Sequence, residues 1–187
     1  MNNGKLFVIS GASGVGKSTV LGKVMVERPD LSFSVSATTR EPRTGEIDGV
    51  HYYFISKEQF EEMINQDAFV EYDAHNKNYY GTPTKQLEEK MTRGPVILDI
   101  EPAGAGIVRK KRPDATLIFI MPPSLEELER RLRSRGDTSE EQIQIRLDRA
   151  KWELEQRLWY DYVVVNDQVE TCANKILEII AQKVDGE

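Results

Sequence analysis

The segment that most constrains this chain lies at residues 11–18, which read Gly-Ala-Ser-Gly-Val-Gly-Lys-Ser. It matches the pattern G-x-x-x-x-G-K-[ST] without a mismatch, and in such loops successive backbone N–H groups cradle phosphate oxygens. Gly11, Gly14 and Gly16 permit the backbone conformations and close approaches that the loop requires. We expect Lys17 to reach the terminal phosphates of a nucleotide and Ser18 to bind Mg2+.

The flanking sequence favours a phosphate-binding loop over a chance glycine-rich turn. Residues 6–9 form an apolar run typical of a buried parallel strand, and residues 19–27 continue as a helix that stops near Pro29. A strand, a loop and a helix in this order are the context that the motif requires, because the helix directs its positive end at the phosphates. The loop alone does not decide whether the nucleotide is a fuel, a switch or a substrate.

Length and composition restrict the class of protein further. The chain has 187 residues, which suits one domain with subdomains, and a formal net charge of −6, which disfavours general binding of nucleic acid. Its single cysteine, Cys172, excludes an intrachain disulfide, and no segment approaches the roughly 20 apolar residues of a membrane span. We expect a cytoplasmic enzyme without a signal peptide, a monomer or a homodimer that binds neither nucleic acid nor a membrane.

Short apolar runs recur along the chain, and helical patterns lie between them. They occupy residues 6–9, 96–100, 117–121 and 162–165. This alternation predicts an α/β fold, a P-loop NTPase core in which helices flank a mostly parallel sheet.

Two segments interrupt that alternation. Residues 35–93 read as a small mixed α/β insertion, which is a natural place for a second substrate. The chain enters this insertion through a strand-like alternation at residues 33–36. Residues 125–149 carry helical patterns. We therefore expect a single domain whose core comprises residues 1–34, 94–124 and 150–187.

The insertion carries polar groups suited to an anionic, aromatic ligand. Arg40 and Arg43 lie three apart on a loop, and together with the Ser36 hydroxyl their guanidinium groups would bind a phosphate well. Tyr52 and Tyr80 add phenolic donors. An isolated loop arginine is usually only solvated, but the clustering of these residues beside a phosphate-binding loop favours a binding site.

A carboxylate in the same insertion indicates which ligand this is. Glu71 lies in an apolar segment, where a carboxylate requires donors, and the N1–H and N2–H groups of guanine would supply two. No Cys/His cluster has metal-ligand spacing, so a zinc site is not expected.

Several motifs now resemble the guanylate kinase family, in order and in approximate spacing over nearly the whole chain. They are Thr-Thr-Arg-Glu-Pro-Arg-Thr-Gly-Glu at residues 38–46, Phe-Val-Glu at 69–71, Asn-Tyr-Tyr-Gly-Thr at 78–82, Asp99, Arg135-Gly136, Arg146 and Tyr-Asp-Tyr-Val-Val-Val-Asn-Asp at 160–167. The resemblance implies transfer of the γ-phosphoryl group of ATP to GMP, giving ADP and GDP in purine nucleotide metabolism, with Mg2+ as cofactor.

The resemblance also implies a role for each matching residue. The GMP phosphate would be held by Ser36, Arg40, Arg43 and Tyr80, with help from Tyr52. The guanine would be read by Glu71, Thr82 and Asp99, and Gly81 and Glu101 would complete the GMP site. ATP would be held by Gly11, Ala12, Ser13, Gly14, Val15, Gly16, Lys17, Ser18, Thr19 and, at the adenine, Asn166. The catalytic cations would be Lys17, Arg43, Arg135 and Arg146. The last two lie in the segment that resembles the family's lid, residues 125–149, which would close over the transferring phosphoryl group.

Two segments depart from the family pattern. Residues 101–104 read Glu-Pro-Ala-Gly where the family usually has Asp, an apolar residue and Gln-Gly, which changes a carboxylate near the expected Mg2+ and removes a backbone N–H at Pro102. Residues 73–78 differ from the commoner Val-His-Gly-Asn version.

Three alternatives remain open at this stage. One is a P-loop kinase of another nucleoside monophosphate or of a different small phosphorylated acceptor. The second is a guanylate-kinase-like protein-binding module, although such modules commonly lack an intact ATP loop. The third is a GTPase switch, although the Asn-Lys-x-Asp type of guanine reader is absent from the sequence.

Overall fold

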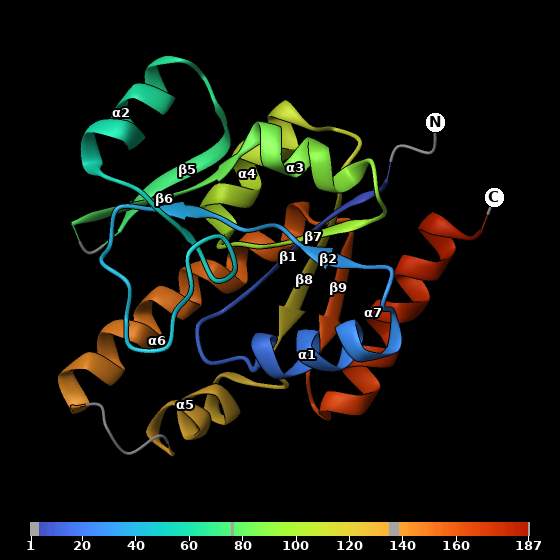
Figure 1. Ribbon diagram of the computed structural model, residues 1–187. Helices are drawn as coiled ribbons and strands as arrows, with labels where there is room; N and C mark the ends of the chain where they lie inside the picture. Colours follow the sequence, from blue (N-terminus) through green and yellow to red (C-terminus); the bar gives the residue numbers. More distant parts are fainter. Residues whose placement is uncertain (1–3, 76, 135–138, 187) are drawn as a thin grey trace.

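The computed structural model describes residues 4–75, 77–134 and 139–186. Its centre is a five-stranded parallel sheet in the order β2-β7-β1-β8-β9 (Figure 1). These strands are β1 (Leu6–Gly11), β2 (Ser32–Phe33), β7 (Val96–Asp99), β8 (Thr116–Met121) and β9 (Tyr162–Val165). The four strands predicted from apolar runs are confirmed as β1, β7, β8 and β9.

Helices cover both faces of this sheet, which explains why the central strands β7, β1 and β8 are continuously apolar. On one face, Phe7 and Ile9 of β1 pack with helices α1 (Lys17–Glu27) and α7 (Val169–Val184). On the other face, Leu6 and Val8 pack with α3 (Thr84–Met91), α4 (Pro102–Lys111) and α6 (Glu140–Glu155). The sequence therefore folds into a three-layer α/β core, as predicted.

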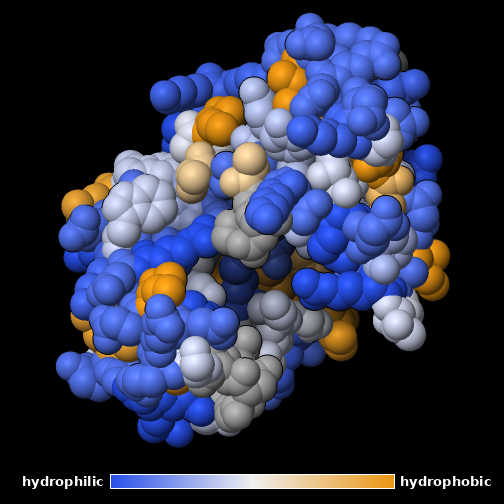
Figure 2. Space-filling model, turned by 90° about the vertical axis from the view of Figure 1, so that its left-hand side faces the viewer, coloured by the Kyte–Doolittle hydropathy of each residue, from blue (hydrophilic) through white to orange (hydrophobic). Residues whose placement is uncertain are grey.

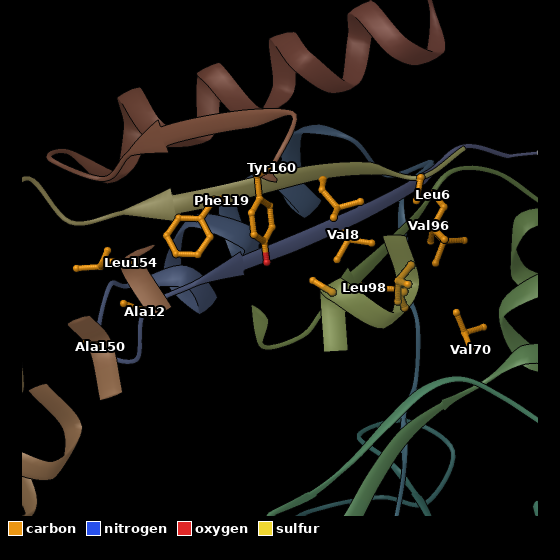
Figure 3. Packing of buried hydrophobic residues seen from close by; sticks show 14 of the residues in the cluster. Leu6, Val8, Ala12, Val70, Val96, Leu98, Phe119, Ala150, Leu154 and Tyr160 are labelled. Carbon is orange, nitrogen blue, oxygen red and sulfur yellow. The ribbon is translucent and has the colours of Figure 1, made fainter. Parts of the chain in front are cut away.

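The core on the face covered by α3, α4 and α6 extends toward the phosphate-binding loop. Figure 3 shows Ala150 and Leu154 of α6 beside Ala12 of that loop, with Phe119 and Tyr160 next to them. The rings of Phe119 and Tyr160 meet edge to face, with centroids 5.0 Å apart. One end of α6 is thus anchored in the core beneath the loop.

A second sheet lies at one end of the first and forms a small subdomain (Figure 1). Its order is β4-β3-β6-β5, and its own core gathers around Phe60 and Phe69. Helix α2 (Lys57–Asn65) begins with the predicted capping box, in which the side chains of Ser56 and Gln59 bond reciprocally to backbone N–H groups. The strands are β3 (Ala37–Thr38), β4 (Tyr53–Phe54), β5 (Phe69–His75) and β6 (Asn78–Pro83).

The strand predicted at residues 33–36 is wrong, and the reason is instructive. The N–H of Ser34 donates to the carbonyl of Ile97 in the large sheet, at 2.9 Å, whereas the carbonyl of Ser36 accepts from Tyr53 in the small sheet, at 2.9 Å. The chain therefore crosses from one sheet to the other between Ser34 and Ser36, and strand structure stops at Phe33 and resumes at Ala37.

Helix α4 lies between β7 and β8, where the alternation of apolar runs and helical patterns predicts a helix without giving its bounds. Its first residue is Pro102, and the missing N–H costs nothing there because the first N–H groups of a helix have no intrahelical acceptor. Pro102 is therefore accommodated without loss of a backbone bond. In the described part of the chain, no helix is long and apolar enough to cross a membrane.

Candidate active site

The phosphate-binding loop joins β1 to α1, and its glycines are required by the backbone. Gly14 and Gly16 have φ angles of 89° and 91°, in the left-handed region that glycine adopts freely, and Gly16 is the N-cap of α1. A Cβ on Gly11 would lie 2.6 Å from the carbonyl oxygen of Ile120. The loop thus needs glycine at all three positions.

This loop surrounds a cavity of about 270 Å3, called the donor cavity below. Backbone N–H groups and the start of a helix dipole face the same space, which is an arrangement suited to phosphate. The lining consists of residues 11–19 together with Glu101, Arg146 and Glu153. The structure therefore brings together the nine contiguous residues that the sequence assigned to ATP.

Side chains from the C-terminal half hold the loop from behind. A carboxylate oxygen of Glu153 accepts from the N–H of Ser13 at 3.0 Å, and the other accepts from Nε of Arg149 at 3.0 Å. Arg149 also pairs with Glu101. Glu153 is only 2% exposed, and this burial raises the pKa of its carboxyl. The sequence predicted neither Arg149 nor Glu153, since no motif marks them.

Asn166 lies under the loop as well. Its amide Nδ2 donates to the carbonyl of Val15 at 2.8 Å, and Arg131 donates to the same carbonyl at 3.1 Å. The Asn166 side chain is buried, so in this structure it supports the loop. The adenine contact that the sequence implied for it stays a prediction.

One of the two arginines predicted to lie in a lid reaches the loop. Helices α5 (Leu125–Arg133) and α6 lie on the side of the loop away from the large sheet (Figure 1). Nη2 of Arg146 on α6 donates to the hydroxyl of Ser13 at 3.2 Å. Arg135, the other predicted lid arginine, lies outside the described residues. Helix α6 runs without interruption past residue 149, the boundary expected between lid and core.

A second cavity of about 230 Å3, the acceptor cavity, lies between the small sheet and the carboxyl end of β7. Figure 2 shows the same side of the molecule hollowed between the small subdomain above and the lid helices below, with mostly hydrophilic residues around the hollow. The cavity is lined by Ser36, Tyr52, Glu71, Asp73, Tyr80, Asp99, Ile100, Glu101 and Gly104.

Glu71 is the most buried ionisable group of this cavity. The register of β5 and β6 shifts between Phe69 and Glu71, a bulge that sets Glu71 opposite Thr82. The Thr82 hydroxyl donates to Oε1 of Glu71 at 2.6 Å, whereas Oε2 lies 2.8 Å from where a Cβ on Gly104 would stand. Burial raises the pKa of the Glu71 carboxyl. One carboxylate oxygen thus remains for a ligand.

The cationic side of the insertion is organised around Arg40. Its guanidinium forms a two-pronged ion pair with Glu46 at 2.8 and 2.9 Å and lies 5.4 Å from the ring centre of Tyr52. The backbone N–H of Arg43 donates to the same carboxylate at 2.7 Å. The bond from Arg40, aided by that from Arg43, lowers the pKa of Glu46 to about 2. Among the described residues, none pairs with the guanidinium of Arg43.

One ion pair joins the two cavities. Lys17, which lines the donor cavity, pairs with Asp99, which lines the acceptor cavity. Strands β1 and β7 are parallel neighbours, with Ile9 opposite Asp99, so both strands finish at the same end of the sheet. The pair forms there, because Asp99 ends β7 and Lys17 lies just after the loop that follows β1. The carboxyl ends of the strands are where ligands bind in open α/β sheets.

Two residues that the sequence assigned to GMP lie behind the cavity wall. Thr82 is fully buried and faces Glu71, and a Cβ on Gly81 would lie 2.8 Å from the Cβ of Tyr72. Their direct contact with a ligand stays a prediction. Asp73, Ile100 and Gly104 line the cavity and were not predicted; for Gly104 the signal was the glycine in the family pattern.

Comparisons with known proteins agree with this geometry. A guanylate kinase family model matches residues 3–183. The curated guanylate kinase of Carboxydothermus hydrogenoformans is 48% identical over 181 residues, which cover 96% of this chain and 89% of that protein. The chain belongs to the guanylate kinase family. A guanylate kinase of Thermus thermophilus is 49% identical over 178 residues, covering 95% of this chain and 80% of that protein.

Solved structures extend the comparison to the fold. Guanylate kinase from Anaplasma phagocytophilum superimposes with a TM-score of 0.76 at 32% identity, covering 98% of this chain and 87% of that one. A gluconokinase from Sinorhizobium meliloti, with a TM-score of 0.51 at 16% identity, shares the fold alone. The resemblance to guanylate kinases and the P-loop fold are thus confirmed. Guanylate kinases are nucleoside monophosphate kinases, transferases that move the γ-phosphoryl group of ATP to GMP.

Proposed function

We propose that this chain transfers the γ-phosphoryl group of ATP, bound in the donor cavity, to GMP, bound in the acceptor cavity. The observation that carries the proposal is the meeting of the two cavities at Lys17 and Asp99. A glycine-rich phosphate cradle on one side and a buried carboxylate, Glu71, on the other provide for two different nucleotides. GDP and ADP would be the products, as purine nucleotide metabolism requires.

In the donor cavity, the loop would hold the phosphates of ATP. The N–H groups of residues 11–19 provide the cradle, and Lys17 would leave Asp99 for the terminal phosphates, which carry more negative charge than one carboxylate. Asn166 would act near the adenine, in addition to the bond by which it supports Val15.

In the acceptor cavity, the two ends would divide the recognition of GMP. Glu71 would accept from the guanine edge, with Thr82 and Asp99 as further readers and Gly81 and Glu101 in the adjoining wall. The phosphate would lie against Ser36, Tyr52 and Tyr80, with the guanidinium groups of Arg40 and Arg43 neutralising its charge.

The transfer itself requires positioning and neutralisation of charge. An oxygen of the GMP phosphate attacks the γ-phosphorus in line, and no covalent intermediate with the protein is needed. Lys17, Arg43, Arg135 and Arg146 would offset the charge that donor and acceptor share. Because the lid arginines need phosphates as partners, we expect the lid, residues 125–149, to close over both substrates and exclude water from the γ-phosphoryl group.

The residues at the cavity junction fit Mg2+. The Ser18 hydroxyl and the carboxylates of Asp99 and Glu101 are oxygen donors at the edge of the loop, and Mg2+ is commonly held by one or two carboxylates together with substrate phosphates. In the described residues, no group of three or more His, Cys, Asp or Glu side chains could hold a metal by itself. When bound, Mg2+ neutralises charge on the phosphates.

The remaining parts of the proposal concern the setting. We place the enzyme in the cytoplasm as a monomer or homodimer, with no nucleic-acid or membrane partner. The single domain would comprise a core at residues 1–34, 94–124 and 150–187, a GMP-binding subdomain at 35–93 and the lid.

A nucleotide panel tests the proposed reaction. With ATP and Mg2+, release of ADP is measured for GMP, AMP, UMP, CMP and dTMP as acceptors. We expect the highest kcat/KM with GMP. A preference for another monophosphate would make the chain a different monophosphate kinase. Binding of GMP without turnover would identify a binding module, and hydrolysis of GTP alone would identify a switch.

A further inference from the structure

One acidic side chain of the acceptor cavity has no role in the reaction as described. Four carboxylates line the cavity, and three of them have partners or roles: Glu71 faces Thr82, Asp99 pairs with Lys17 and Glu101 pairs with Arg149. The fourth is Asp73. Within the described parts of the chain, its carboxylate accepts only the N–H of its neighbour Ala74, at 2.8 Å, and pairs with no cation.

Strand register places Asp73 in the cavity. Residues two apart on a strand point to the same face, so Asp73 follows Glu71 along the inner face of β5. In the antiparallel partner β6, Thr82 stands opposite Glu71 and Tyr80 stands opposite Asp73. One pair therefore belongs to the guanine end of the proposed site, and the next pair, roughly 7 Å along the strand, belongs to the phosphate end.

The sugar of a bound nucleotide must span those two ends. A carboxylate accepts hydrogen bonds and donates none, so the GMP phosphate is repelled from Asp73. The guanine N–H groups are assigned to Glu71, which lies deeper in the cavity, and to Asp99, the further reader proposed above. The donors that remain on GMP are the hydroxyl groups of its ribose.

We propose that Asp73 accepts a hydrogen bond from a ribose hydroxyl of GMP, and that it makes this kinase discriminate against deoxyribose acceptors. The inference rests on the proposed function, because it assigns a partner within the same acceptor site. Since Asp73 is exposed, the bond competes with water, and its removal has a modest effect compared with that of a buried polar contact.

The test compares GMP with its 2′-deoxy and 3′-deoxy analogues as acceptors. In the unmodified enzyme, we expect at least one deoxy analogue to have a kcat/KM about tenfold below that of GMP. In Asp73→Ala that ratio falls to about one, whereas Asp73→Asn, which keeps an acceptor oxygen, retains part of it. Glu89→Ala, an exposed acid on α3 outside the cavity, is the matched control and keeps the full ratio.

The outcomes separate this inference from the function on which it rests. If the enzyme phosphorylates GMP and both deoxy analogues equally well, or if Asp73→Ala keeps the original ratio, the role of Asp73 is disproved while the kinase function stands. If GMP is not phosphorylated at all, the proposed function itself fails. Melting temperatures of the variants confirm that each is folded, which the few contacts of Asp73 lead us to expect.

Discussion

The donor and acceptor cavities adjoin each other but are built in opposite ways. The loop around the donor cavity is contiguous in sequence, yet the side chains that hold it in place, such as Glu153 and Asn166, are more than one hundred residues away. The acceptor cavity draws on scattered residues, yet two polar pairs of the small subdomain are local, Thr82 with Glu71 in the cavity wall and Arg40 with Glu46 in the loop that follows β3. A conspicuous motif therefore depends on remote support, whereas the part of the acceptor site that lies in the small subdomain largely supports itself.

The largest effect is expected where the two cavities act together. Arg146→Ala removes a cation that reaches Ser13 of the loop, and we expect kcat to fall by roughly 10³-fold or more with a small change in KM, as for arginines that stabilise the transition state of phosphoryl transfer. Steady-state kinetics measure both constants. Arg130→Ala, whose arginine is paired with Glu127 on the surface of α5, serves as control. A near-normal kcat for Arg146→Ala contradicts the assignment.

A smaller but still large effect tests whether the acceptor cavity is truly independent of the core. Gly104 lies in α4, and a Cβ there would lie 2.8 Å from Oε2 of Glu71. We expect Gly104→Ala to displace this carboxylate and lower kcat/KM for GMP by roughly 100-fold, the loss of one charged hydrogen bond. In Gly106→Ala, on the same helix, the new methyl group meets Trp159 only at 3.8 Å. Equal activity of the two variants would show that α4 does not shape the site.

Glu71→Gln separates acceptor binding from fold stability. We expect kcat/KM for GMP to fall by roughly 10- to 100-fold, because an amide cannot accept from both guanine donors, while KM for ATP stays unchanged. The pKa of Glu71 is raised in the folded protein, so the ionised carboxylate destabilises the fold. This destabilisation is complete at a pH above the folded pKa and absent at a pH below the ordinary value of 4.5. The variant should therefore melt higher than the parent at pH 8, and the difference should vanish at pH 4. A lower melting temperature at pH 8 would show that the charge of Glu71 stabilises the fold.

Glu153→Ala tests the remote support of the donor loop. The variant leaves the N–H of Ser13 without its acceptor, which costs about 1–3 kcal/mol, so we expect KM for ATP to rise by roughly tenfold with little change in KM for GMP. Glu155→Ala, an exposed acid on the same helix, is the control. If KM for GMP rises as much as KM for ATP, the two cavities are not separately supported.

The smallest effect concerns a helical glycine on the donor side. A Cβ on Gly22 of α1 meets no atom within 4 Å, in contrast to Gly104. Gly22→Ala should stabilise the fold by about 0.5–1 kcal/mol through helix propensity and leave the kinetics unchanged. Chemical denaturation measures the gain. A loss of stability would indicate that α1 does not tolerate a methyl group at this position.

The sequence by itself determined the features whose causes are local. The four apolar runs form four of the five strands of the large sheet. Of these, β1, β7 and β8 are buried on both faces, whereas β9, at the edge of the sheet, leaves Val163 and Val165 exposed. The loop at residues 11–18 has its shape because glycine alone tolerates its φ angles. The capping box at Ser56 likewise needs only residues three apart. The expectation that Glu71, a carboxylate in an apolar segment, requires a hydrogen-bond donor also rests on local sequence, and in the structure Thr82 is one such donor.

Tertiary structure alone decided the contacts that join distant segments. The pairs Lys17–Asp99 and Ser13–Glu153 span 82 and 140 positions, and no local pattern specifies either of them. The strand expected at residues 33–36 was divided because two sheets compete for its backbone hydrogen bonds. The bounds of α4 were left open by the sequence, because its Pro-Ala-Gly start has no helical periodicity. Local chemistry thus specified what each cavity contains, while the parallel neighbours β1 and β7 decided that the two cavities face each other.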